Sequence, residues 1–172
     1  MKTTIFFFFF SFLAFAQPSS SSIFERKHEF TFGMVKLLAG PIVELNYEHI
    51  QSEDFTFGTS ILVNGRNDND WEEDFSVTPF ARFYFQEQKA FAAKGLFVEG
   101  FAKYSSGRNN DYTRENEQKY SAASLGMGVG YKWINRTGFV FQILLGGGRT
   151  LGQPENAPDF LFRGDLQLGY RF

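Results

Sequence analysis

The chain contains no cysteine and only two histidines in 172 residues. The absence of cysteine excludes a disulfide framework and any thiolate metal site. Lysine and arginine together number 17, against 19 aspartates and glutamates, and they form no stripe along the sequence. Because nucleic-acid-binding domains carry a basic patch or stripe, nucleic acid is not an expected partner.

Long apolar runs are also missing after Ala16. A membrane-spanning helix needs about 20 predominantly apolar residues, and no later segment approaches that length. If the chain crosses a membrane, a closed β-barrel is the remaining architecture, because each unpaired backbone group in lipid costs several kcal/mol.

The first 16 residues have the three parts of a secretory signal peptide. MKTT is a short, positively charged start, an apolar run rich in phenylalanine extends from Ile5 to Phe15, and the run ends on the small-x-small sequence AFA. Residues 1–16 are therefore predicted to be a signal peptide, the alternative being a retained N-terminal anchor. Residues 17–28 are expected to form a flexible leader, and residues 29–172 one domain.

Apolar and polar residues alternate with a period of two through most of this domain, which predicts β-strands with one apolar and one polar face. The alternation is clearest in the last segment, where Phe160, Phe162, Leu168, Tyr170 and Phe172 share one parity. The expected fold is all-β, an eight-stranded up-and-down antiparallel barrel, and the run VKLL at the end of the first segment indicates a bulge. The eight predicted strands span residues 29–38, 42–50, 55–64, 74–86, 95–104, 119–133, 139–149 and 160–172.

Alternation alone leaves open which face is inside, and three features favour an outward apolar face in contact with lipid. The polar parity carries few charges, of both signs, as expected for mutually paired groups in an enclosed interior. Gly126, Gly128 and Gly130 share that parity and leave room for large neighbours inside a narrow barrel. Aromatic residues gather near strand ends on the apolar parity, as they do at membrane interfaces. The predicted interior charge network consists of Glu44, Glu48, Arg82, Glu99, Lys103, Arg163, Asp165 and Arg171.

The connections between strands give an orientation. If the chain starts in the periplasm, residues 51–54, 87–94 and 134–138 are periplasmic turns. The outward connections are then residues 39–41, 65–73, 105–118 and 151–159. Three of the four outward connections are longer than the turns, as outer-membrane barrels prefer. The exceptions are the short first loop and the rather long turn at 87–94.

Several motifs carry a family resemblance. The chain stops on Tyr170-Arg171-Phe172, which resembles the C-terminal strand that the barrel-assembly machinery reads, with Gln167 where that signal usually has glycine. The runs LLAGPIVELNYEHIQSEDFTFGTSI, PFARFYFQ and GLFVEGFAKYSSG resemble a family of uncharacterised small outer-membrane β-barrel proteins of Gram-negative bacteria. The resemblance implies a transmembrane barrel like those of OmpX, OmpW and OmpA. Tyr170 and Phe172 would be its assembly signal, and outer-membrane lipid and lipopolysaccharide its surroundings.

No catalytic, cofactor-binding or metal-binding residues are predicted. His28 and His49 lack a recognisable serine and carboxylate arrangement, and the acidic stretch Asn67–Asp74 lacks the spacing of an EF-hand loop. We expect a monomeric, non-enzymatic barrel with a filled interior and a structural or interaction role through its outer loops. The alternatives are a soluble periplasmic lipocalin-like barrel that binds lipid, and an outer-membrane lipid-modifying enzyme.

Overall fold

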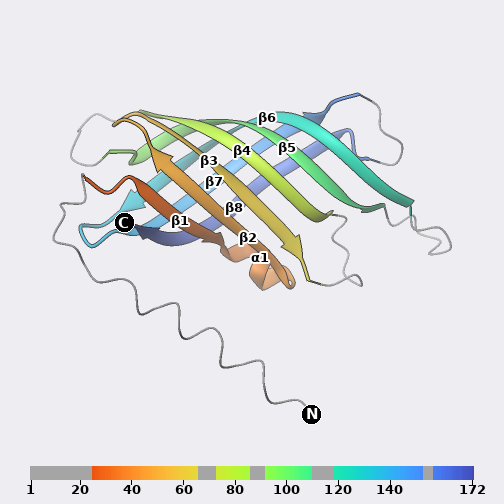
Figure 1. The fold of residues 1–172 in the computed structure, drawn as a ribbon, viewed down its shortest axis with the longest axis horizontal. Helices are drawn as coiled ribbons and strands as arrows, with labels where there is room; N and C mark the ends of the chain where they lie inside the picture. The colour runs from red at the N-terminus through yellow and green to blue at the C-terminus, as the bar shows by residue number, and fades with distance from the viewer. Residues whose placement is uncertain (1–24, 66–72, 86–91, 110–117, 153–156) are drawn as a thin grey trace, which may run out of the picture.

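The computed structural model describes residues 25–65, 73–85, 92–109, 118–152 and 157–172. Its strands pair antiparallel in sequence order, and the first also pairs with the last, so the sheet closes on itself (Figure 1). The all-β, eight-stranded up-and-down barrel predicted from the sequence is confirmed. The elements are β1 (His28–Gly33), α1 (Met34–Ala39), β2 (Ile42–Ile50), β3 (Phe55–Asn64), β4 (Glu73–Phe85), β5 (Gly95–Asn109), β6 (Gln118–Ile134), β7 (Phe139–Thr150) and β8 (Phe160–Arg171).

The two ends of the barrel differ. In Figure 1 the C-terminus lies at one end and α1 lies at the other. We call the end with the β2–β3, β4–β5 and β6–β7 connections the short-turn end, and the opposite end the loop end. The predicted signal peptide, residues 1–16, lies outside the described residues. Within those residues, no helix has the length and hydrophobicity to cross a membrane.

The helix α1 stands where the sequence predicted the second half of the first strand and a bulge, and that prediction is wrong. The run MVKLLA has no period-two alternation and consists mostly of good helix formers. The Asp165 carboxylate accepts a hydrogen bond of 2.9 Å from the Val35 backbone N–H in the first turn. The Gly40 N–H bonds the Lys36 carbonyl at 3.1 Å and ends the helix.

The helix also fills a notch in the barrel wall. Pairing of β1 with β2 stops at Phe32 and Leu45, and pairing of β1 with β8 stops at Gly33 and Gln167. The remaining parts of β2 and β8 towards the loop end have no strand between them, and α1 contacts both. The closed wall is therefore part sheet and part helix at this point.

Strand β5 is longer than predicted, since it continues from Tyr104 to Asn109 into the expected loop. Residues 105–109 are polar or glycine on both parities, so no alternation marks them as a strand. They pair with the beginning of β6, and Gly107 also faces Glu73 of β4. The long hairpin β5–β6 thus extends the barrel at the loop end.

Most large apolar side chains face outward along every strand, and most polar and charged side chains of the strands face inward. Met127 is 71% exposed, whereas Arg82 and Glu99 are 1% and 0% exposed. The outward direction of the apolar face agrees with the prediction from the sequence.

Large and small residues are matched across neighbouring strands inside the barrel. Phe97 lies opposite Gly130 and Phe101 opposite Gly126. A Cβ atom added to Gly130 or Gly126 would come within 2.4 or 2.3 Å of the Cζ atom of the facing ring. The glycines of β6 therefore make room for inward phenylalanines, as the narrow diameter of an eight-stranded barrel requires.

Candidate functional site

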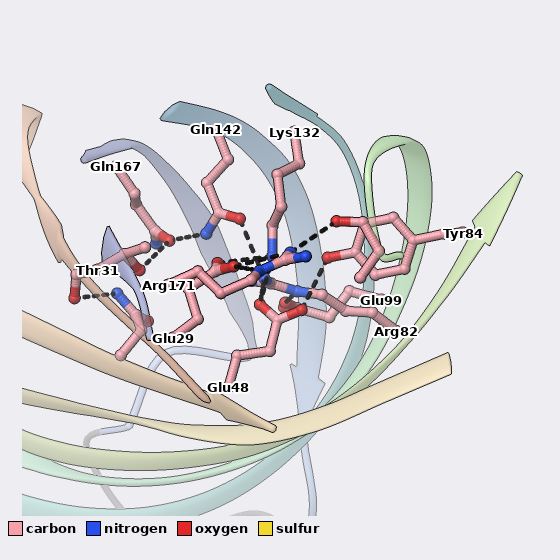
Figure 2. A network of polar contacts seen from close by, with 12 residues as sticks. Glu29, Thr31, Glu48, Arg82, Tyr84, Glu99, Lys132, Gln142, Gln167 and Arg171 are labelled. Atoms are coloured by element: carbon pink, nitrogen blue, oxygen red, sulfur yellow. Dashed lines mark hydrogen bonds and ion pairs between the residues drawn. The ribbon is translucent and has the colours of Figure 1, made fainter. Parts of the chain in front are cut away.

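A continuous chain of ion pairs runs along the barrel interior, and it begins at the short-turn end. Arg171 Nη2 lies 3.0 Å from Glu29 Oε2, and its guanidinium also donates to the carbonyls of Ala92 (2.6 Å) and Ala93 (3.1 Å). The Lys132 ammonium lies between two carboxylates, 2.7 Å from Glu29 and 2.8 Å from Glu48. Figure 2 shows these groups converging from strands on opposite sides of the barrel.

Glu99 joins two arginines in the middle of the barrel. Its Oε2 accepts a hydrogen bond of 2.8 Å from Arg82 Nε, and its Oε1 accepts one of 2.8 Å from Arg163 Nε. Arg82 also contacts Glu48, whose other oxygen accepts a hydrogen bond of 2.8 Å from the Tyr84 hydroxyl. The contacts around Arg82 appear in Figure 2.

The chain ends at α1, towards the loop end. Glu44 accepts hydrogen bonds from Arg163 (3.2 Å) and Ser60 (2.5 Å) and contacts the Lys36 ammonium. The Lys36 ammonium also lies 3.7 Å from the Asp165 carboxylate. The complete chain alternates five cations with five carboxylates, so their formal charges cancel: Arg171, Lys132, Arg82, Arg163 and Lys36 against Glu29, Glu48, Glu99, Glu44 and Asp165.

Aromatic rings cover the faces of the interior cations. The Arg82 guanidinium carbon lies 4.3 Å from the Phe80 ring centroid and 4.7 Å from that of Phe97. The Arg163 guanidinium lies 5.4 Å from the centroid of Phe101, and the Lys132 ammonium 5.3 Å from that of Tyr84. Such contacts compensate part of the hydration that a buried cation loses.

Described side chains pack against the chain of ion pairs at its two extremities. A buried apolar cluster of Ile50, Tyr84, Ala93, Phe97 and Leu144 lies at the short-turn end. At the loop end, α1 sits between β2 and β8 with Lys36 directed at the interior carboxylates. The arrangement is that of a packed polar core, and eight strands leave interior space for side chains rather than for a water channel.

The structure brings seven of the eight residues of the predicted network into this chain. The exception is Lys103, which forms a separate ion pair of 2.7 Å with Glu73. Sequence reasoning missed Glu29, Lys36 and Lys132. Glu29 and Lys132 share the inward parity of their strands, which could have revealed them, but Lys36 lies on the helix and follows no strand parity.

His28 and His49 lie outside the barrel at the short-turn end, and His28 begins β1 rather than belonging to the leader. Their ring centroids are 5.1 Å apart, and His28 Nδ1 lies 2.8 Å from the Tyr47 hydroxyl. His49 packs 5.2 Å from the Phe57 ring. These neighbours are aromatic, and in the part of the chain that the structure describes no group of three or more His, Cys, Asp or Glu could hold a metal ion.

The acidic stretch Asn67–Asp74 is only partly covered, since residues 66–72 lie outside the described residues. Glu73 pairs with Lys103, and the Asp74 carboxylate accepts hydrogen bonds of 2.8 and 3.0 Å from Arg108. The two described carboxylates are thus engaged with cations of β5.

Tyr170 and Phe172 lie at the seam where the barrel closes. The Phe172 N–H bonds the His28 carbonyl at 2.8 Å, and the His28 N–H bonds the Phe172 carbonyl at 3.2 Å. The Phe172 ring stacks 5.8 Å from Phe30, and Tyr170 packs edge-on at 5.7 Å from Phe139. Their role as an assembly signal stays a prediction.

Comparison of the chain with models of protein families, with curated proteins and with solved structures finds no match. The fold therefore rests on the strand pairing described above. The resemblance to small outer-membrane barrels rests on the sequence motifs.

Proposed function

We propose that the protein is a small outer-membrane β-barrel with a sealed, side-chain-filled interior, which acts structurally or through contacts of its outer loops. Its surroundings would be outer-membrane lipid and lipopolysaccharide, and the barrel-assembly machinery would insert it after export. The loop end would face outward, and the short-turn end would face the periplasm.

The observation that carries this proposal is the inverted distribution of side chains. Large apolar residues are exposed on all eight strands, from Phe30 on β1 to Phe172 beyond β8, while the buried chain of ion pairs occupies the interior. A barrel in water buries its apolar face, because burial contributes about 25 cal/mol per Å² of apolar surface. A barrel in lipid gains the same benefit by turning that face outward.

Aromatic rings on the outer wall support the same proposal. Near the short-turn end they form a belt of contacts, among them Tyr131 with Trp133 at 4.4 Å and Trp133 with Phe141 at 5.3 Å. Phe30 and Tyr47 add a contact of 5.3 Å on the other side of the seam. Aromatic girdles of this kind lie at the interfaces of membrane barrels.

The interior argues against the two alternatives. A lipocalin-like carrier needs an apolar cavity for its ligand, but among the described residues the middle of this interior holds ion pairs and the rings that cover them. A lipid-modifying enzyme would need a histidine beside a serine near the outward rim. His28 and His49 instead lie at the short-turn end, among aromatic residues.

Fractionation of cells that express the full chain tests the proposal. We expect the protein in the outer-membrane fraction, resistant to alkaline extraction. Its unboiled form should migrate differently from the boiled form on a gel, because a closed barrel resists detergent. Recovery in the soluble periplasmic extract without detergent would refute the proposal and favour the lipocalin-like alternative.

A further inference from the structure

The outer wall is hollowed along β8 near the short-turn end. This groove encloses about 710 Å³, and its lining is almost wholly apolar. Six side chains from four neighbouring strands form most of it: Phe30, Phe32, Trp133, Phe141, Leu168 and Tyr170.

Strand register explains the hollow. Leu168 lies between Phe32 of β1 and Phe141 of β7, and Phe141 in turn lies opposite Trp133 of β6. The smaller leucine is thus flanked by rings that project further from the wall. The groove, which we also call the trough, therefore runs parallel to β8, and the spacing of β1, β8 and β7 sets its width.

A cation stands where the trough reaches the short-turn end. Arg26 Nη1 donates to the Thr137 carbonyl at 2.9 Å and to the Tyr170 hydroxyl at 3.1 Å, and the guanidinium carbon lies 5.8 Å from the Tyr170 centroid. Among the described residues, Arg26 Nε and Nη2 have no hydrogen-bond partner. The Arg26 guanidinium therefore retains N–H donors, and a guanidinium group is well suited to bind phosphate oxygens.

We propose that this groove binds an anionic phospholipid, with an acyl chain along β8 and the phosphate on Arg26. The inference rests on the proposed membrane location and adds a preference for head-group charge at one place on the wall. The trough supplies apolar contact for the chain, and the arginine, already held by Tyr170 and Thr137, supplies a positioned cation.

Trp133 makes the groove observable. The chain has two tryptophans, so Trp71→Phe leaves Trp133 as the sole fluorophore. This protein is refolded into phosphatidylcholine vesicles that contain a small fraction of acyl-brominated phosphatidylglycerol, or the same fraction of acyl-brominated phosphatidylcholine. Bromine quenches the indole only at contact range. We expect quenching that corresponds to an enrichment of phosphatidylglycerol of about five-fold, since a basic residue near a membrane contributes about 1 kcal/mol to binding anionic lipid.

Three substitutions that replace an arginine, each made in the Trp71→Phe protein, test which residue gives the preference for phosphatidylglycerol. Arg26→Gln should abolish it, and Arg26→Lys should keep most of it. Arg149→Gln removes the same charge from an exposed position at the other end of β7 and should leave it unchanged. If Arg26→Gln does not refold, Leu168→Phe fills the floor of the trough while all cations remain, and it should also abolish the preference.

The outcomes separate this inference from the proposed function. Equal quenching by the two brominated lipids in inserted protein overturns the lipid site and leaves the membrane barrel in place. A preference that survives Arg26→Gln or Leu168→Phe also overturns the site, because the excess lipid then lies elsewhere. Protein that does not enter the vesicles, as judged by flotation, overturns both proposals.

Discussion

The substitution Met127→Arg distinguishes a barrel whose outer face lies in lipid from one whose outer face lies in water. Met127 lies near the centre of β6 and is 71% exposed. Phe160 is the first residue of β8, at the loop end, and is 66% exposed. The two side chains are almost equally accessible, so their position along the barrel is the main difference between them.

The expected magnitudes follow from depth. In a membrane, arginine on the lipid-facing wall costs about 2–4 kcal/mol at the midplane and about 0–1 kcal/mol near the interface. We therefore expect Met127→Arg to lose about 2–4 kcal/mol of the free energy of unfolding and Phe160→Arg at most about 1 kcal/mol. On a wall in water, both substitutions should stay within about 0.5 kcal/mol, as surface substitutions usually do.

The assay is urea unfolding of each variant refolded into phosphatidylcholine vesicles, followed by tryptophan fluorescence. Leu125→Arg and Ile143→Arg repeat the test on the outer wall of β6 and β7, and both should be destabilised or blocked in insertion. If Met127→Arg and Phe160→Arg lose the same fraction of a kcal/mol, the outer face is not in lipid and the proposed function is wrong.

Three further predictions concern the interior. Gly130→Ala should lower the free energy of unfolding by about 1–3 kcal/mol through overpacking. Gly100→Ala, whose Cβ would meet nothing within 4 Å, should leave it nearly unchanged. Equal losses for the two variants would contradict the matching of large and small residues inside the barrel. Glu99→Gln should lower the free energy of unfolding by about 3–5 kcal/mol, because it breaks a buried ion pair. The control Asp74→Asn, at a partly exposed ion pair, should lower it by about 0–1 kcal/mol. Both values are read from urea titrations, and a small loss for Glu99→Gln would refute the central role of Glu99. Lys36→Met should increase the rate of hydrogen exchange of the α1 amides about tenfold or more, since a hydrogen bond to a charged group contributes about 1.5–3 kcal/mol to stability. An unchanged rate would show that the ion pairs of Lys36 do not stabilise the helix.

Period-two alternation predicted most of the strands because it is a property of the local backbone. Strands β2 and β3 have the predicted bounds, and β8 differs by one residue at its end. The failures occur where alternation is missing. The run MVKLLA became a helix, and the polar end of β5 became strand, because pairing with neighbouring segments decides the conformation there.

Parity likewise selected most of the interior charges, but it could not assign their partners. It named Arg82, Glu99 and Arg163 as interior residues without showing that one carboxylate joins two arginines. It also grouped Lys103 with the others, although that lysine lies towards the loop end and pairs with Glu73.

The sequence by itself determined most of the strands, the side of the sheet that most of their residues face, and the excess of apolar surface on one side. Only the tertiary structure decided how the chain closes, where α1 fills the wall, which ions meet and where the outer wall is hollow. The physical reason is distance along the chain. The ion pair of Glu29 and Arg171 joins residues 142 positions apart, and the groove over β8 combines side chains of four strands that meet only after closure.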